Sequence, residues 1–489
     1  MNTAALLIPA LRYDAAFGFR HLQDHIDDCL ELGVGGFLIY GGSAAEVTAL
    51  TEDLRRRSSL PLLLAADVER GAGQQFADTL ALPPFGALGS LGDVDIIRRA
   101  ARITARELKR VGLNWAFAPV CDLDVAPFSP IVNTRAAGGD AATVAAAVSE
   151  WIDACQAEGV LACAKHFPGH GRADGDSHVM LPGVLAGAEQ LWRDDLLPFR
   201  AAVDAGVASM MTAHVTYASL DATGEPATLS KPLLTELLRG VMEFDGLLVS
   251  DALEMDGILA VGNEADVAVR AINAGCDVLL SPLNVELTAR ALDRAVQEGH
   301  IHSERLREAL ERRQRWAQWA HPSGGREASL DDVAWARQVA DRTVHVARGA
   351  APRVGEAVEI VLVDDDAGGP WLVPNRTRFG AMFHAFHVNA MVVAEPSAGT
   401  KVPVLVALFA DVVAWKGADG VSEEGVQRAQ RALDVAAHQG REGCVVLFSH
   451  PRHVALFDAS TNVVCAWGGE APMQEAAARV IASRSLVRR

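Results

Sequence analysis

The residue types that could carry chemistry are most concentrated in the segment from Lys165 to Pro182, which reads KHFPGHGRADGDSHVMLP. Within thirteen residues it holds three histidines and two aspartates: His166, His170, Asp174, Asp176 and His178. Asp176 and His178 are two residues apart, so in an extended loop their side chains leave the chain on the same side. A carboxylate beside an imidazole fixes the tautomer of the ring and raises its basicity, which suits a general acid/base near neutral pH.

A second candidate is Asp251, which follows the apolar run GLLVS. One interpretation is structural, because Asp is a favoured N-cap and the stretch DALEMDGILAV would be the helix that it opens. The other is chemical: a carboxylate at the end of a buried strand could attack an anomeric carbon and hold the resulting glycosyl-enzyme ester. The residues by themselves leave both interpretations open.

The histidines have a further interpretation as metal ligands. His166 and His170, together with Asp176 or His178, are residue types common in zinc hydrolases. The spacing of the two histidines in HFPGH is that of a helical metal-binding pair. However, the Pro-Gly pair between them disfavours a helix at this point. This alternative predicts an activity that chelators remove and zinc restores.

The elements that must position these residues are indicated by eight short apolar runs in the first 320 or so residues. Continuous apolar runs predict strands that are buried on both faces, as in a parallel sheet with helices outside. Amphipathic stretches with helical spacing separate the runs. Eight βα units in this length fit an α/β fold of the (β/α)8 TIM-barrel type better than an open sheet. The runs span residues 5–11, 35–40, 60–69, 114–123, 160–169, 208–215, 246–253 and 274–282.

Polar residues follow five of these predicted strands. Reactive groups of such barrels collect where the strands end and the βα loops begin. We therefore expect these residues to meet at one rim and to form a shared active site. They are Asp67, Asp122, Lys165 with His166, His214, and Ser250 with Asp251.

The chain divides into a predicted barrel domain over residues 1–320, a linker and connecting helix over 321–350, and a second domain over 351–489. The linker HPSGGREASLDD is rich in turn formers and charge, and a helical stretch, DDVAWARQVADRTVHVARG, follows it. Apolar runs and amphipathic stretches then alternate again, which predicts a smaller three-layer α/β/α domain. Its predicted strands span residues 357–364, 402–411, 444–450 and 462–469.

Composition excludes several classes of protein. The formal net charge of -18 over 489 residues argues against nucleic-acid binding, which needs a basic face. No apolar run reaches the length of a membrane span, so no membrane partner is expected. The N-terminal stretch MNTAALLIPALRYD has no basic region before an apolar core, so the predicted compartment is the cytoplasm. The seven cysteines are dispersed and form a poor disulfide framework.

The motif KHFPGHG, followed after four residues by DSH and then by a Pro, resembles the signature of glycoside hydrolase family 3 β-N-acetylglucosaminidases. The stretches GVGGFLIYGG, FAPVCDLD, MMTAHVTYASLD with PATLS, and EFDGLLVSDALEM are also similar to that family and occur in its order. The C-terminal AWGGEAPMQEAAARVI is similar to the end of the family's second domain. The resemblance implies that Asp251 is the nucleophile, that His178 is the acid/base, and that Asp176 orients His178.

The same resemblance implies the residues that bind the sugar. It assigns the sugar hydroxyls to Asp67, Arg135, Lys165 and His166, with His214 as a pocket residue. It also implies a small carbohydrate substrate, an N-acetylglucosaminide, and no metal or organic cofactor. Two loops depart from the family: DVERGAGQQF replaces a usual E-G-G followed by an Arg, and Arg-Ala-Ala-Gly at Arg135 replaces R-S-F-G. Both loops shape the sugar pocket, so the departures bear on substrate specificity.

From the resemblance follows the hypothesis of a retaining two-step displacement through an ester on Asp251. The substrate would be a muropeptide or a chitin-type oligosaccharide that ends in β-linked N-acetylglucosamine. Because the His178 ring becomes neutral when it gives up its proton, phosphate could replace water as the acceptor, and the protein would then be a phosphorylase. The remaining alternatives are the metal-dependent hydrolase, a β-glucosidase or xylosidase of the same fold, and a non-catalytic sugar-binding barrel.

Overall fold

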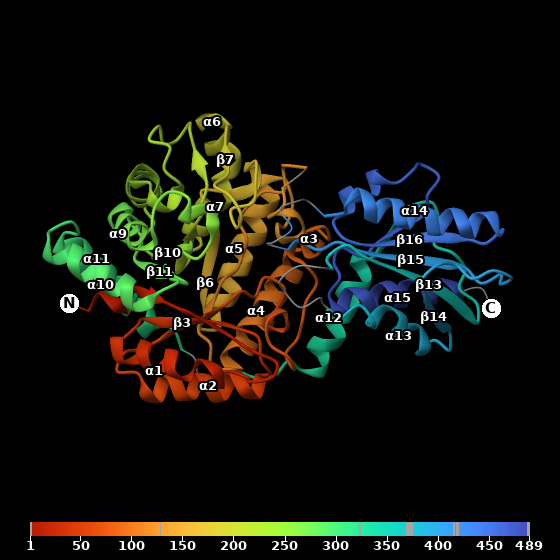
Figure 1. Ribbon diagram of the computed structural model, residues 1–489, viewed down its shortest axis with the longest axis horizontal. Helices are drawn as coiled ribbons and strands as arrows, with labels where there is room; N and C mark the ends of the chain where they lie inside the picture. Colours follow the sequence, from red (N-terminus) through yellow and green to blue (C-terminus); the bar gives the residue numbers. More distant parts are fainter. Residues whose placement is uncertain are drawn as a thin grey trace. The chain divides into compact units, whose positions relative to one another are not determined.

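The structure, a computed structural model, describes residues 2–127, 129–321, 324–367, 375–413, 416 and 420–486 (Figure 1). Contacts between residues divide the chain into two compact units. The second unit includes two short segments that lie within the sequence of the first. The first unit is Met1–Leu80, Asp93–Val132 and Ala136–Ser329, and the second is Ala81–Gly92, Asn133–Arg135 and Leu330–Arg489. Residues 322 and 323 of the predicted linker lie outside the described residues.

The first unit is a barrel that closes through its N-terminal strand. The predicted strand over residues 5–11 is divided at Pro9 into β1 (Leu7–Ile8) and β2 (Ala10–Arg12). β1 pairs with β11 (Val278–Leu280), and β2 pairs with β3 (Gly36–Tyr40). This stretch therefore joins the two ends of the sheet. Pro9 has no N–H to donate, but its carbonyl oxygen accepts a hydrogen bond from the Leu38 N–H at 2.9 Å.

The other barrel strands lie where the apolar runs predict them. All pairings in this sheet are parallel, and most strand residues are buried, as expected when helices cover the outside and side chains fill the inside. The prediction of a (β/α)8 barrel is therefore confirmed. The strands are β3 (Gly36–Tyr40), β4 (Leu63–Ala66), β5 (Trp115–Ala116), β6 (Leu161–Phe167), β8 (Ser209–Thr212), β10 (Leu247–Ala252) and β11 (Val278–Leu280). In the loops after β6 and β8, β7 (Gly183–Val184) pairs with β9 (Thr216–Tyr217).

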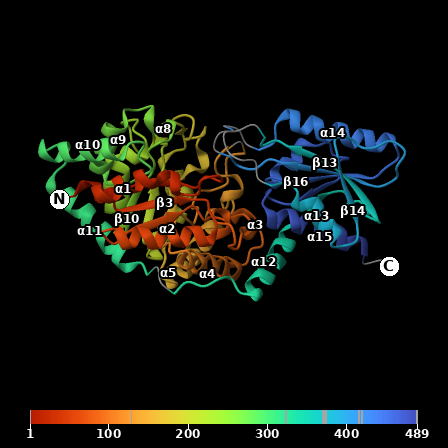
Figure 2. The ribbon, with the colours of Figure 1, turned by 60° about the horizontal axis from the view of Figure 1, so that its bottom comes forward.

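Helices form the outer layer of this unit, and the residues at their ends explain where they begin and stop. Ser43 and Glu46 form a reciprocal capping box at α2, Asp140 caps α5, and Gly33 ends α1 with a φ of 74°. Figure 2 shows α1, α2, α4 and α5 outside the strands. The helices are α1 (Gln23–Leu32), α2 (Ala44–Arg57), α4 (Val94–Arg110), α5 (Ala141–Ala157), α6 (Ala188–Gln190), the π-helical η6 (Leu191–Asp195), α7 (Leu197–Asp204), the π-helical η8 (Pro232–Val241), α8 (Asp256–Leu259), α9 (Glu264–Ala274), α10 (Val285–Gln297) and α11 (Ser303–Trp319). None of the described helices is long and apolar enough to cross a membrane.

The inside of the barrel is a packed core. Apolar side chains from its strands, including Leu38, Leu63, Leu161 and Val249, form one buried cluster around Trp115. The indole N–H of Trp115 donates to Ser209 Oγ at 2.7 Å, and the Ser209 hydroxyl donates to the Ala162 carbonyl at 2.7 Å. The interior polar groups of Trp115 and Ser209 are thus paired, and the strands are held at fixed positions below their polar ends.

The second unit contains a six-stranded sheet in the order β12-β17-β16-β15-β13-β14. β12 runs antiparallel to β17, and the other pairings are parallel. The strands are β12 (His345–Arg348), β13 (Ala357–Asp364), β14 (Asn389–Val393), β15 (Val404–Phe409), β16 (Gly443–Phe448) and β17 (Val463–Cys465). The helices are α3 (Phe85–Gly89), α12 (Leu330–Thr343), α13 (Arg378–His384), α14 (Glu423–His438) and α15 (Ala471–Leu486).

Two apolar cores make this unit a three-layer structure. Alternate residues of the central strands face opposite sides of the sheet. On one side Leu405 and Val446 pack with residues of α12, α13 and α15, and on the other Val406 and Val445 pack with residues of α14. Figure 1 shows α14 on one face of the sheet and α13 and α15 on the other. The predicted three-layer α/β/α arrangement is confirmed.

Two strands of the second unit were not predicted, and one predicted helical stretch was too long. α12 ends at Thr343, and residues 345–348 of the predicted helical stretch form β12 instead. The β-branched Val344 and Val346 favour an extended chain at this point. β14 is an edge strand whose residues are only partly buried, and its short apolar run over residues 390–393 was not recognised as a strand.

Candidate active site

The ends of the barrel strands bring the predicted catalytic residues together. Asp251 is the second-to-last residue of β10, and Lys165 and His166 are among the last three residues of β6. Asp67 follows directly after β4. Because the strands are parallel, their carboxyl ends form one rim. Asp251 interacts electrostatically with His166, His178 and His214, which come from the ends of two other strands and from the loop after β6. The structure therefore brings Asp251 close to these three histidines.

Asp251 is held as an ionised carboxylate with little of its hydrogen-bonding capacity used. Among the described residues, its one hydrogen bond is donated by the Ala252 N–H to Oδ1 at 2.8 Å. Burial by itself raises the pKa of Asp251, but the imidazoles of His166, His214 and His178 outweigh burial, and the pKa lies below its ordinary value. The carboxylate is therefore ionised at neutral pH and available for nucleophilic attack. Its backbone belongs to a strand, and α8 begins only at Asp256, so Asp251 does not cap that helix.

Asp176 and His178 form the predicted pair in the loop after β6. His178 Nδ1 lies 2.8 Å from Asp176 Oδ1, and the same oxygen accepts a hydrogen bond from the His178 backbone N–H at 2.8 Å. Since an ionised carboxylate only accepts, Nδ1 carries the proton and Nε2 is the atom left to exchange one. Asp176 is buried, whereas 38% of the His178 side chain is exposed. This combination fixes the ring while leaving it open to a substrate.

Asp122 organises the start of the same loop. Its carboxylate accepts hydrogen bonds from His166 Nδ1 at 2.7 Å, from the His166 N–H at 3.2 Å and from the His170 N–H at 2.6 Å. Burial raises the pKa of Asp122, but His166 outweighs this effect and the pKa lies below its ordinary value. Asp122 was predicted at the rim without a role. The structure shows that it orients His166, a predicted sugar-binding residue.

Lys165 lies between two carboxylates. Its ammonium nitrogen is 2.7 Å from Asp67 Oδ1 and 2.7 Å from Glu69 Oε1, and the side chain of Lys165 is 2% exposed. The Tyr40 hydroxyl donates to the other oxygen of Asp67 at 3.3 Å. Asp67 is the more exposed of the two carboxylates, 26% against 6% for Glu69. Glu69 was not predicted, although its position two residues after Asp67 in AADVE was a signal for it.

Two further histidines support the site as neutral rings. Burial lowers the pKa of His170 to about 4, and its Nε2 is hydrogen bonded to Ser177 Oγ at 3.0 Å. Burial also lowers the pKa of His214, whose Nε2 donates to the Ala252 carbonyl at 3.0 Å and whose Nδ1 bonds Thr228 Oγ1 at 2.7 Å. His214 thus holds the residue that follows Asp251. Neither Ser177 nor Thr228 was predicted to take part.

Arg135 is the one predicted site residue that the barrel unit does not position. It lies in η4 (Asn133–Arg135), a short turn whose contacts group it with the second unit. Its assignment to sugar binding stays a prediction. In the other altered loop, Gln74 Oε1 accepts a hydrogen bond from the Arg70 N–H at 2.9 Å, so that Gln74 braces the loop itself.

The alternative of a metal site finds no matching geometry in the residues that the structure describes. Among them, no three His, Cys, Asp or Glu side chains are grouped as ligands of one metal ion. The two histidines of HFPGH are bonded to Asp122 and Ser177 instead. They also do not share a helix, because β6 ends at Phe167 and a short turn, η5 (His170–Arg172), begins at His170.

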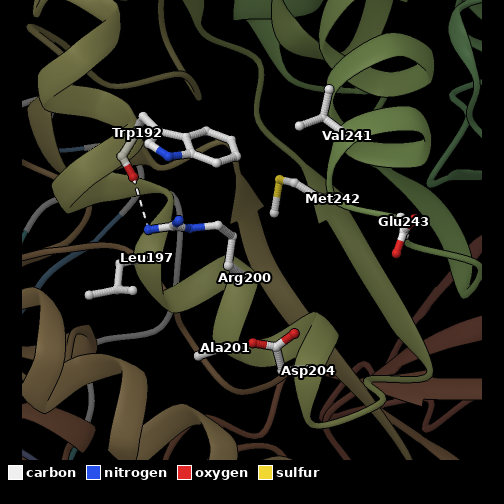
Figure 3. A pocket seen from close by; sticks show the side chains of 8 residues that line it. All are labelled: Trp192, Leu197, Arg200, Ala201, Asp204, Val241, Met242 and Glu243. Carbon is white, nitrogen blue, oxygen red and sulfur yellow. Dashed lines mark hydrogen bonds between the residues drawn. The ribbon is translucent and has the colours of Figure 1, made fainter.

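A separate hollow of about 360 Å³ lies in the outer layer, between α7 with η6 and the end of η8 (Figure 3). Arg200 lies against the Trp192 ring, 4.6 Å from its centroid, and donates to the Trp192 carbonyl. None of the predicted site residues lines this hollow, so it is distinct from the strand-end site. The lining residues are Trp192, Leu197, Arg200, Ala201, Asp204, Val241, Met242 and Glu243.

Comparison with known proteins agrees with this geometry. Residues 19–315 match the N-terminal domain of glycosyl hydrolase family 3. A β-N-acetylglucosaminidase/β-glucosidase of Cellulomonas fimi is 34% identical over 72% of this chain and 66% of its own length, so the chain spans about two thirds of that relative. A β-hexosaminidase of Chromobacterium violaceum is 36% identical over 50% of this chain and 71% of its own length.

The fold is also found in solved structures. A family 3 β-N-acetylglucosaminidase from Paenibacillus sp. superposes with a TM-score of 0.85 at 24% identity, over 98% of this chain and 96% of that one. The likeness extends over both units of the chain. The family match over residues 19–315 covers more than half of the chain and shows that this chain is a member of glycoside hydrolase family 3.

Proposed function

We propose that this family 3 glycoside hydrolase is a retaining exo-β-N-acetylglucosaminidase. The observation that carries the proposal is the pairing of an ionised Asp251 with the Asp176–His178 pair at one barrel rim. A nucleophilic carboxylate and a separate proton-transfer group are the two parts that a retaining glycosidase needs. The name of the Cellulomonas fimi relative, a β-N-acetylglucosaminidase/β-glucosidase, supports N-acetylglucosamine as the sugar.

In the first step, an oxygen of Asp251 attacks the anomeric carbon and forms an ester bond to it. The bond from that carbon to the leaving oxygen breaks, and His178 Nε2 gives its proton to the leaving oxygen. The ring then keeps only its Nδ1 proton, which Asp176 already accepts at 2.8 Å. The step therefore ends with His178 in the neutral tautomer that its partner stabilises.

In the second step, His178 Nε2 removes a proton from water while the water oxygen attacks the anomeric carbon. The ester to Asp251 breaks, and the sugar leaves with its β configuration after two inversions. Asp67, Lys165 and His166 would hold the sugar hydroxyls during both steps, since they lie at the ends of the neighbouring strands. Arg135 joins this set as a proposal from the family motif.

A comparison of substrates tests the choice of sugar. We expect aryl β-N-acetylglucosaminides to be cleaved with a higher kcat/KM than aryl β-glucosides or β-xylosides, which lack the 2-acetamido group. Proton NMR of the first product formed should show the β-anomer, as retention requires. Preference for the glycosides without the acetamido group, or a first product in the α configuration, would contradict the proposal. Muropeptide fragments and chitin-type oligosaccharides are the natural substrates to compare next.

One feature favours phosphate as an alternative acceptor. A carboxylate in the role of His178 would be anionic in the glycosyl-enzyme and would repel phosphate, whereas the imidazole is neutral at that stage. The protein would then be a phosphorylase that works through the same ester. Running the reaction with and without inorganic phosphate and identifying the sugar product separates the two functions. Free N-acetylglucosamine in both reactions indicates a hydrolase, and the sugar 1-phosphate indicates a phosphorylase.

A further inference from the structure

One residue lies between the two members of the acid/base pair, and it is buried. Ser177 lies between Asp176 and His178 and is 1% exposed, whereas Val179 and Met180 are 46% and 49% exposed. The apolar side chains that follow the pair therefore do not anchor the loop. The buried residues at the pair, Asp176 and Ser177, are polar, so hydrogen bonds must fix its position.

One of these hydrogen bonds comes from the side of β6. Ser177 Oγ is hydrogen bonded to His170 Nε2 at 3.0 Å, and the His170 backbone N–H donates to the buried Asp122 carboxylate at 2.6 Å. The same carboxylate binds His166 Nδ1 at 2.7 Å. The side chain of Ser177 is thereby tied to the group that also orients the end of β6.

The other hydrogen bond comes from the side of the nucleophile. Gly257 lies in α8, which begins five residues after Asp251, and its N–H donates to the Ser177 carbonyl at 3.2 Å. A Cβ atom at Gly257 would lie 2.5 Å from the Ser177 carbonyl oxygen and 2.6 Å from that of Met180. These are backbone atoms, so no flexible side chain can yield. Only glycine lets α8 approach the loop this closely.

We infer that Ser177 is a positioning residue, held by His170 through its hydroxyl and by Gly257 through its carbonyl, which sets His178 relative to Asp251. We call Ser177, His170 and Gly257 the Ser177 clamp. The two arms of the clamp lie in the segments that follow β6 and β10, His170 in η5 and Gly257 in α8. The inference rests on the proposed function, because it concerns the proton transfer that His178 performs.

A displaced acid/base pair has a specific kinetic signature. A leaving group such as 2,4-dinitrophenolate departs without protonation, whereas an alkyl or sugar alcohol needs the proton of His178. kcat/KM reports only the steps up to formation of the glycosyl-enzyme, so water or phosphate as acceptor makes no difference to it. A loosened clamp should therefore lower kcat/KM for the poor leaving group and spare the good one.

The test compares Gly257→Ala and Ser177→Ala with the wild-type chain on 2,4-dinitrophenyl and methyl β-N-acetylglucosaminide. We expect kcat/KM for the 2,4-dinitrophenyl glycoside, divided by kcat/KM for the methyl glycoside, to rise by about 10-fold or more in each variant. The reason is that a general acid contributes about 10²–10⁴-fold. Gly187→Ala is the matched control, because a Cβ at Gly187 meets nothing within 4 Å, and its ratio should not change. Thermal denaturation of all variants shows whether each one is folded at the assay temperature.

The outcomes separate the clamp from the function on which it rests. Equal losses for both substrates, or no loss for either, in folded Gly257→Ala and Ser177→Ala would overturn the clamp while leaving the proposed function intact. If Gly257→Ala does not fold, Ser177→Ala decides alone, because it removes only a hydroxyl. A wild-type chain that cleaves neither glycoside contradicts the proposed function. The inference about the Ser177 clamp is then overturned as well, because it depends on that function.

Discussion

Asp251 and Asp277 belong to neighbouring strands of the same barrel and lie at opposite ends of it. Asp277 precedes β11 and is fully buried, and its carboxylate accepts hydrogen bonds from Arg239 at 2.6 Å, Arg305 at 2.6 Å and the Leu248 N–H at 3.0 Å. Asp251 ends β10 and, among the described residues, accepts one hydrogen bond, from the Ala252 N–H. Both carboxylates adjoin apolar strands, so residue type does not distinguish them.

The two carboxylates differ in the number of hydrogen bonds that their oxygens already accept. The oxygens of Asp277 are bonded to two guanidinium groups and a backbone N–H, so this residue contributes to stability. Asp251 is surrounded by imidazoles, which keep it ionised without occupying both oxygens. A barrel of this kind places chemistry at the carboxyl ends of its strands and stability at the amino ends. Four substitutions test this division.

The largest effect is expected for Asp251→Ala. Removal of the nucleophile should lower kcat for an aryl β-N-acetylglucosaminide by about four orders of magnitude or more. The variant should lose little stability, because Asp251 accepts a single hydrogen bond among the described residues and has no arginine or lysine partner there. Steady-state kinetics and thermal denaturation measure the two quantities. Substantial residual turnover would remove Asp251 from the mechanism.

The next largest effect is expected for Asp176→Asn. The amide cannot stabilise the charged His178 ring and can donate to Nδ1, which favours the wrong tautomer. We expect kcat/KM for a glycoside with a poor leaving group to fall about 10²–10⁴-fold, with a smaller loss for 2,4-dinitrophenyl β-N-acetylglucosaminide. Equal losses for both glycosides would show that Asp176 serves the fold of the loop rather than proton transfer.

Asp277→Asn should produce the opposite pattern to Asp251→Ala. Two partly buried arginines would lose the charge of their buried partner, and the free energy of unfolding should fall by about 3–5 kcal/mol. Turnover per folded molecule should stay unchanged. The control is Asp245→Asn, whose carboxylate is 70% exposed where it meets Arg315, and which should cost about 1 kcal/mol or less. Urea denaturation measures the free energy of unfolding of both variants. Equal losses in Asp277→Asn and Asp245→Asn would show that the buried carboxylate of Asp277 has no special role in stability.

The smallest effect concerns pH. Because the pKa of Asp251 lies below its ordinary value, the nucleophile stays ionised as the pH falls, and the acid limb of kcat/KM should lie below about pH 3.9. His214 becomes charged as the pH falls and opposes protonation of Asp251. His214→Gln keeps a donor for the Ala252 carbonyl but removes this charge, so the acid limb should move to higher pH. A pH–rate profile that is identical to that of the wild type would show that His214 does not lower the pKa of Asp251.

Much of the fold was predictable because burial leaves a mark on the sequence. Strands covered on both faces must be apolar throughout, and the eight runs in the first 320 or so residues confirm this. The division of the first strand at Pro9 was not predictable from the runs, because it depends on closure of the sheet. The edge strand β14 was missed although residues 390–393 are apolar, because this run is short and the strand is only partly buried.

The site was predictable where its residues are adjacent in the sequence or end a predicted strand. Asp176 and His178 belong to one motif, and Asp251 ends an apolar run. Glu69 and Gly257 were missed because their roles depend on contacts with residues far along the chain, such as Lys165 and Ser177. No local pattern records a backbone approach like that of Gly257. Such residues emerge only when the two segments are seen together.

The central claim is that Asp251 forms a covalent bond to the sugar, and mass spectrometry tests it most directly. The protein is incubated with a 5-fluoro β-N-acetylglucosaminyl fluoride, which forms the glycosyl-enzyme quickly and releases it slowly. The intact protein should gain the mass of one fluorosugar, and peptide mapping should locate the sugar on Asp251. An adduct on another residue, or inactivation without any adduct, would contradict the account.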